Sequence, residues 1–186
     1  MRRKLLSWAA TIGLAVAFVL VFEVAVAQPF RIPSSSMEPT LKCAKPGLGC
    51  TATFNDRVLA AKIVYDFRNP ERGEIAVFHA PAAAKARCSE GGTFVKRVIG
   101  LPGDVVGERD GHVTIDGKLL VEPYVPAVDR DHTTQTWKRL GPGQYFVMGD
   151  HRNDSCDSRV WGPVPRSAFI GPVVATYWPP SDWSIP

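Results

Sequence analysis

The chain has 186 residues, of which 45% are hydrophobic and 22% charged, and this composition is typical of a folded domain. Its 16 glycines and 16 prolines indicate many turns, but not the composition bias of a disordered chain. The net charge of +4 is modest and comes partly from the first four residues. We therefore expect no nucleic-acid binding.

The N-terminus combines a basic start with a long apolar run. Arg2-Arg3-Lys4 precedes an uncharged, mostly apolar segment from Leu5 to Phe22. That length is near the roughly 20 residues that span a bilayer, and the positive-inside rule keeps the basic start in the cytoplasm. We expect residues 1–27 to form a cytoplasmic start and a single-pass transmembrane anchor in the plasma membrane, with residues 28–186 outside the cytoplasm.

A cleaved secretory signal is the alternative interpretation of the same segment. Ala25-Val26-Ala27 has the A-x-A form of a cleavage site and follows a basic start and an apolar run. The apolar run is longer than that of a usual secretory signal, which favours an uncleaved anchor. Both interpretations place the rest of the chain outside the cytoplasm.

The four cysteines are compatible with disulfides in an oxidising compartment. Four cysteines allow three pairings. Cys43 and Cys50 enclose a short Gly/Pro loop and are the natural local pair, which leaves Cys88 and Cys156 as a possible second pair. Zinc binding is disfavoured, because there is no C-x-x-C pair and the histidines are scattered.

Downstream of the apolar segment the sequence predicts an all-β domain. Short apolar runs rich in β-branched residues alternate with Gly/Pro turns. Asp116-Gly117 separates 113–115 from 118–120 and predicts a two-residue hairpin. Residues 169–178 are expected to form two strands that Gly171-Pro172 interrupts. The other predicted strands are 57–60, 74–79, 93–99 and 144–148.

Two segments carry candidate catalytic groups. Pro33-Ser34-Ser35-Ser36 is stiffened by proline and could present a hydroxyl nucleophile, although Ser/Pro-rich stretches are also typical of linkers. A serine needs a base, and a lysine can serve if it is held neutral by burial. Lys96 lies within the predicted strand 93–99, where alternation turns it either to the core or, as an edge-strand residue, to water.

Four motifs in order resemble those of the bacterial type I signal peptidases. They are Pro-Ser-x-Ser-Met-x-Pro-Thr-Leu at 33–41, Asn-Asp-Arg-Val-Leu at 55–59, Lys-Arg-Val-Ile-Gly-Leu-Pro-Gly-Asp at 96–104 and Gly-Asp-His-Arg-Asn-Asp-Ser-Cys-Asp-Ser-Arg at 149–159. The resemblance covers nearly the whole chain. It implies a coiled antiparallel β-sheet catalytic domain behind one N-terminal transmembrane helix.

The resemblance also implies roles for individual residues. Ser36 matches the nucleophile and Lys96 the general base of a Ser/Lys dyad. Ser34 and the backbone N–H of Ser36 match the oxyanion hole. Ser155 matches the serine that orients the lysine. Asp157 and Arg159 match a supporting charged pair.

The same resemblance implies a serine endopeptidase that removes signal peptides after A-x-A sites without metal or cofactor. Its partners would be secretory precursors and the lipid bilayer, and we expect a monomer. The span of about 104–143 has room only for a small cap. Two alternatives stay open: a specialised Ser/Lys peptidase for a few envelope proteins, and an anchored domain that binds leaders without cutting them.

His151 raises the alternative of a Ser-His-Asp triad. His151 departs from the family's third motif, as do Asn153 and Asp154, and it follows Asp150. We interpret His151 as a surface-loop histidine rather than a catalytic base, because the lysine motif is intact. His79, His112 and His132 lie near turns or strand ends and receive no role.

Overall fold

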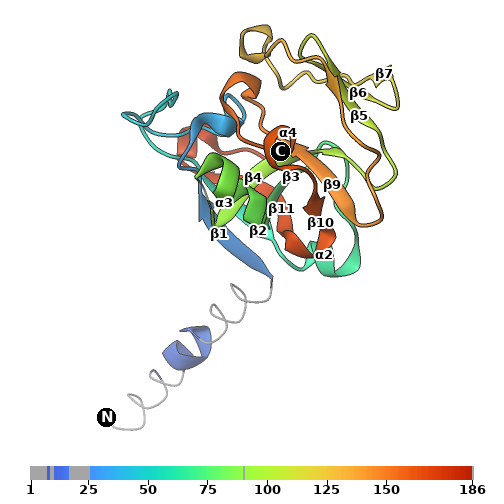
Figure 1. Cartoon of the computed structure of the whole chain (residues 1–186). Coiled ribbons are helices and arrows are strands. Elements are labelled where there is room, and N and C mark those ends of the chain that lie inside the picture. Colours follow the sequence, from blue (N-terminus) through green and yellow to red (C-terminus); the bar gives the residue numbers. More distant parts are fainter. Residues whose placement is uncertain (1–7, 9–10, 17–25, 90, 186) are drawn as a thin grey trace.

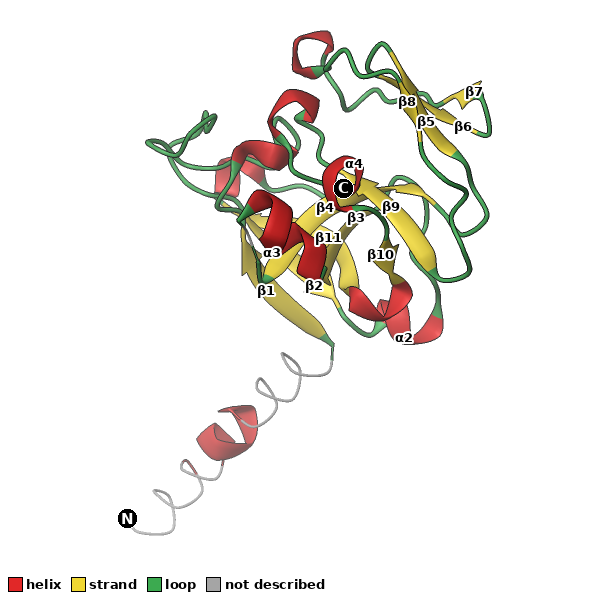
Figure 2. Cartoon of the chain, viewed as in Figure 1, coloured by secondary structure: helices red, strands yellow, loops and turns green. Residues whose placement is uncertain are grey.

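The computed structural model describes residues 8, 11–16, 26–89 and 91–185, and these form two antiparallel β-sheets with short helices around them (Figures 1 and 2). The larger sheet has the order β1 (Ala27–Arg31), β2 (Arg57–Ala61), β11 (Phe169–Trp178), β3 (Ile75–His79), β4 (Thr93–Gly100), β9 (Gln144–Met148) and β10 (Val164–Pro165). The smaller sheet has the order β7 (Lys118–Leu119), β6 (His112–Ile115), β5 (Val106–Arg109) and β8 (Gln135–Thr136).

The helices that the structure describes downstream of residue 26 are short. The α-helices are α2 (Val64–Phe67), α3 (Ala82–Cys88) and α4 (Ser158–Trp161). The 3₁₀-helices are η1 (Ser35–Met37), η2 (Ala127–Asp129), η3 (Arg152–Asp154), η4 (Arg166–Ala168) and η5 (Pro180–Asp182). Figure 2 shows that the strands dominate, which confirms the mainly β, antiparallel fold class.

The predicted strands are present with small changes at their ends, but the expected strand pair at 169–178 is wrong. β11 is one continuous strand. Its first part, from Phe169 to Pro172, pairs with β3, and its second part, from Val173 to Trp178, pairs with β2. Gly171-Pro172 makes a register shift after Phe169 rather than a turn. Glycine is needed there, because a Cβ at Gly171 would lie 2.6 Å from the Ala61 carbonyl oxygen.

The core consists of three clusters that fix the elements around the site. One lies under η1 and contains Met37 and Leu41 together with Val77 of β3. A second contains Phe78 and Trp161 and joins β3 to α4. The third packs the smaller sheet against β4 and β9, and its members are Ile99, Val106, Val113, Leu140, Phe146 and Met148. The smaller sheet is therefore fixed to the strand that carries Lys96.

Most of the predicted anchor, Leu5 to Phe22, lies outside the described residues. Residues 11–16 are helical. Among the helices that the structure describes, none has both the length and the apolar character needed to cross a membrane.

Candidate active site

The serine segment folds into a tight, anchored turn. Ser34 is the extended N-cap of η1, and Leu41 donates a backbone hydrogen bond to the Met37 carbonyl at 2.8 Å. Met37 is 1% exposed and Ser35 is 4% exposed, whereas Ser36 is half-buried. Burial of its two neighbours holds the Ser36 side chain at the surface of the core, facing the site.

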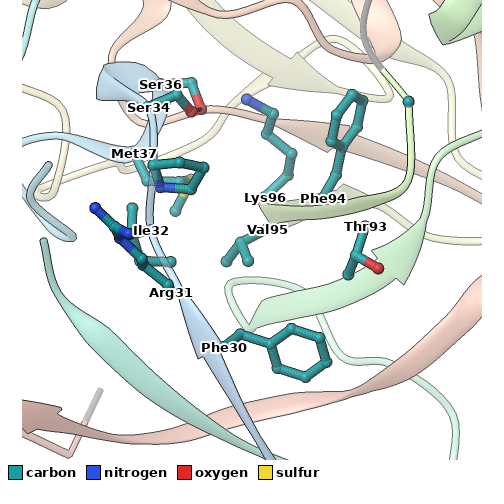
Figure 3. Close-up of a pocket in the computed structure, with 12 residues that line it drawn as sticks. Phe30, Arg31, Ile32, Ser34, Ser36, Met37, Thr93, Phe94, Val95 and Lys96 are labelled. Atoms are coloured by element: carbon teal, nitrogen blue, oxygen red, sulfur yellow. Dashed lines mark hydrogen bonds between the residues drawn. The ribbon is translucent and has the colours of Figure 1, made fainter. Parts of the chain in front are cut away.

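The Ser36 hydroxyl lies opposite a buried lysine. The hydroxyl oxygens of Ser34 and Ser36 are 3.4 Å apart, and Figure 3 shows both directed toward the amine end of Lys96. Lys96 comes from β4, is 4% exposed, and donates from Nζ to Ser155 Oγ at 3.0 Å. The structure thus brings four of the predicted site residues together, from three segments distant in sequence.

Two cavities meet at these residues. The first, of about 290 Å³, has an apolar wall that includes Phe30, Ile32 and Val95 (Figure 3). The second, of about 530 Å³, lies on the other side and is lined by Leu48 and Val160 among others. Both cavities share four lining residues, Pro33, Ser34, Ser36 and Lys96. An extended peptide that fills both would therefore pass over the Ser36 hydroxyl.

Gly149 allows the third motif to approach the serine turn. A Cβ at this position would overlap the Ser36 carbonyl oxygen and the Ser155 hydroxyl. The backbone N–H of His151 donates to the same Ser36 carbonyl at 3.2 Å. Contact between the two segments is thus backbone to backbone, and it places Ser155 beside Lys96.

Asp150 ties three segments of the site together. Its carboxylate accepts two hydrogen bonds from Arg97, at 2.9 Å from Nε and 2.6 Å from Nη2, and one from Thr40 Oγ1 at 2.6 Å. Asp150 is fully buried, and the Arg97 guanidinium stacks 3.8 Å from the centroid of the Tyr124 ring. A bidentate, charge-assisted contact of this kind fixes geometry as well as adding energy.

Asp157 and Arg159 brace the segment that carries Ser155. Asp157 accepts from the backbone of Gly149 at 3.0 Å and from Arg159 Nε at 2.9 Å. Burial alone would raise the pKa of the Asp157 carboxyl, but the hydrogen bonds and charge of Arg159 outweigh burial, and the pKa lies below its usual value. Asp157 is therefore a carboxylate at neutral pH, and its charge also acts on Lys96.

The smaller sheet and its loops contribute three carboxylates to the same network, of which Glu108 and Glu122 are buried and Asp131 is half-buried. Glu122 pairs with Arg152, whose Nε donates to the Gly149 carbonyl at 2.9 Å. Asp131 accepts from Arg159 Nη1. Glu108 of β5 lies 3.8 Å from the same Arg159 nitrogen and is 3% exposed. Within the described part of the chain, neither oxygen of the Glu108 carboxyl has a hydrogen-bond partner.

Glu108 makes stability dependent on pH. Burial raises the pKa of its carboxyl from 4.5 to about 7, against the opposing charge of Arg159. Between these values the folded protein holds a proton that the unfolded chain has lost, so the free energy of unfolding falls as pH rises through this window. Each pKa unit corresponds to about 1.4 kcal/mol, so the cost of ionised Glu108 at pH 8 is on the order of 3 kcal/mol.

We expect Glu108→Gln to remove this cost. The variant should gain stability relative to the natural protein as pH is raised from 5 to 8, because glutamine cannot ionise. Urea unfolding in detergent at both pH values measures the difference. A stability difference that stays the same at pH 5 and pH 8 would show that Glu108 does not titrate in this window.

The remaining candidates are placed as follows. The His151 ring is half-buried in its loop, and its Nε2 lies 3.8 Å from Asp129. Disulfides join Cys43 to Cys50, with Cα atoms 4.9 Å apart, and Cys88 to Cys156, with Cα atoms 6.3 Å apart.

The sequence matches the signal peptidase family, peptidase S26, over residues 5–178. The chain belongs to this family. It is 41% identical over 169 residues to "Probable signal peptidase I-2" of Synechocystis sp., covering 91% of this chain and 71% of the relative. It is 40% identical over 172 residues to signal peptidase I of Leptolyngbya laminosa, covering 91% and 77%.

A more distant relative is matched over almost its whole length. Identity to signal peptidase IB of Staphylococcus aureus is 32% over 201 aligned positions, covering 98% of this chain and 94% of the relative. The protein is therefore a serine endopeptidase of the signal peptidase I type, and it removes signal peptides from secretory precursors. This excludes the non-enzymatic alternative, a domain that only binds leaders.

Proposed function

We propose that the enzyme works through a dyad in which Ser36 is the nucleophile and Lys96 the general base. The observation that carries the proposal is the position of the Ser36 hydroxyl and the buried Lys96 amine where the two cavities meet. Burial disfavours the charged form of a lysine, whereas the nearby Asp157 carboxylate favours it. Only the neutral amine can accept the serine proton.

The reaction then has two halves. Lys96 takes the Ser36 proton as Ser36 Oγ attacks the scissile carbonyl, and it later gives a proton to the leaving amine. Ser34 Oγ and the Ser36 backbone N–H stabilise the oxyanion, where one such donor is commonly worth about 2.7–4 kcal/mol. A water that Lys96 deprotonates finally hydrolyses the acyl-enzyme. Ser155 holds the amine in position, with Asp157 and Arg159 bracing the loop.

The precursor binds as an added strand with small side chains in the apolar cavity. β1 lies at the edge of the larger sheet, and along residues 93–96 β4 pairs only with β3 in the described structure. A peptide strand can pair with such an edge. Successive side chains of a strand alternate, so the first and third of A-x-A face the wall formed by Phe30, Ile32 and Val95. That wall leaves room for small side chains.

A purified enzyme and a leader panel test this proposal. Wild-type protein is expected to cut several unrelated precursors directly after A-x-A, and a serine-directed acylating inhibitor is expected to label Ser36. Replacement of the first or third alanine by leucine should slow cleavage. If only one precursor in a broad panel is cut, the enzyme is a specialised processing peptidase. Labelling of any other serine would refute the dyad.

We also propose that residues 1–27 anchor the enzyme as a single-pass membrane protein with residues 28–186, the catalytic domain and its small cap, outside the cytoplasm. The uncharged segment from Leu5 to Phe22 behind Arg2-Arg3-Lys4 supports this topology. Cleavage of its own Ala27–Gln28 bond would cut at the start of β1, which is paired with β2 from Ala27 onward. N-terminal sequencing of membrane-extracted protein should give the intact start, and a dominant start at Gln28 would overturn the anchor.

A further inference from the structure

The short segment that carries Ser155 has few restraints of its own. Ser155 and Cys156 lie between η3 and α4, and in the described structure neither backbone N–H donates a hydrogen bond of ordinary length and angle. The Ser155 carbonyl accepts only a long contact, at 3.5 Å, from Arg159 Nη2. The flanking residues are better held, since Asp154 accepts from Ser35 Oγ and Asp157 from Gly149. The backbone of Ser155 and Cys156 must therefore be restrained by a contact other than these hydrogen bonds.

The Cys88–Cys156 disulfide supplies that restraint from the opposite side of the site. Cys88 is the last residue of α3, which packs beside α4 (Figure 1). Arg87 Nη1 donates to the Val160 carbonyl at 2.5 Å, and Ala84 is fully buried in the core cluster that contains Trp161. α3 is thus anchored to the core, and the disulfide transmits this anchoring to the residue next to Ser155.

We propose that Cys88 and Cys156 are positioning residues of the reaction, because their disulfide holds the Ser155 hydroxyl where it orients the Lys96 amine. This inference rests on the proposed Ser36/Lys96 dyad. Ser155 Oγ is 3.0 Å from Lys96 Nζ, so a small displacement of the segment changes the direction of the base relative to Ser36. Misplacement of a reacting group by about 1 Å can cost about 100-fold in rate.

The test is a mutant cycle that separates positioning from general stabilisation. We expect Cys88→Ser/Cys156→Ser to lower kcat/KM for an A-x-A precursor by about tenfold, within the range of such displacements. In a Ser155→Ala background the same pair of substitutions should change the rate less than twofold, because the group that the disulfide positions is already gone. Single-turnover assays at high enzyme concentration make both backgrounds measurable.

Cys43→Ser/Cys50→Ser is the matched control. It removes the other disulfide, and its effect should be the same with and without the Ser155 hydroxyl. Removal of a disulfide from a small secreted domain commonly costs about 2–5 kcal/mol of stability, so every variant is assayed at a temperature where unfolding curves show it fully folded. This keeps a loss of rate distinct from a loss of folded protein.

The outcomes distinguish this inference from the dyad on which it rests. If the Cys88/Cys156 variant loses the same factor in both backgrounds, or loses nothing in either, the positioning role is refuted while the dyad stands. Free thiols at Cys88 and Cys156 in protein isolated from membranes without reductant would refute it as well. If Ser36→Ala itself remains active, the dyad has failed independently of the disulfide.

Discussion

Ser36→Ala and Lys96→Ala are each expected to abolish signal-peptide cleavage while leaving the fold intact. The first removes the nucleophile and the second removes the base, and neither side chain belongs to the apolar clusters that hold the sheets together. Because the two groups act in one proton transfer, the double variant should be little slower than either single variant. Lys96→His should not restore activity, since an imidazole is too short to replace the amine.

The neighbouring serines provide the matched controls. Ser35 is 4% exposed and its hydroxyl is hydrogen-bonded to Asp154 rather than turned to Lys96, so Ser35→Ala should retain most activity. Ser34→Ala removes one oxyanion donor and should cost about 10²–10³ in kcat. On one precursor, the expected loss of activity is therefore small for Ser35→Ala, intermediate for Ser34→Ala and complete for Ser36→Ala. Retention of more than a few per cent of activity by Lys96→Ala would mean that another group is the base.

The sequence was most informative where a local motif carries the chemistry. The strand of Lys96 was predictable, because side-chain alternation acts over a few residues. The stiff, proline-flanked serine segment was also recognised, but not the turn that it forms at 35–37. β1 escaped prediction for a physical reason: Pro29 lies in its middle, and proline is tolerated only in an edge strand such as this one. The five residues of β1 do not indicate by themselves that the strand lies at the edge of a sheet.

The sequence indicated the Asp157–Arg159 pair but not the ion pairs around it, such as Arg97–Asp150, because their partners are distant in sequence. Alternation allows one face of β4 to be buried, yet Lys96 and Arg97 are both buried, at 4% and 8% exposure. Each face of the strand is covered by a different segment, since Lys96 meets Ser155 and Arg97 meets Asp150 and Tyr124. No local pattern indicates which acid 53 residues away will neutralise Arg97.

Gly149→Ala should slow cleavage severely, although residue 149 carries no reactive group. Gly149 is not among the glycines with positive φ, so alanine meets no backbone strain there. The cost is steric, because the new methyl group overlaps the Ser36 carbonyl oxygen and the Ser155 hydroxyl. Relief by movement is opposed by the next residue, Asp150, which Arg97 and Thr40 hold in place.

The new methyl group can be accommodated only if the segment 149–155 moves away from η1 against these hydrogen bonds. Such a movement separates Ser155 and Lys96 from Ser36. We expect kcat/KM to fall by at least about 100-fold, as for a displacement of about 1 Å, and stability to fall by about 1–3 kcal/mol, as for overpacking of a tight contact. Gly141→Ala is the matched control, because its Cβ would meet only the end of the exposed Gln144 side chain, at 3.1 Å. A Gly149→Ala protein that is folded at the assay temperature and cleaves at more than half the natural rate would show that the close backbone contact is not needed to assemble the site.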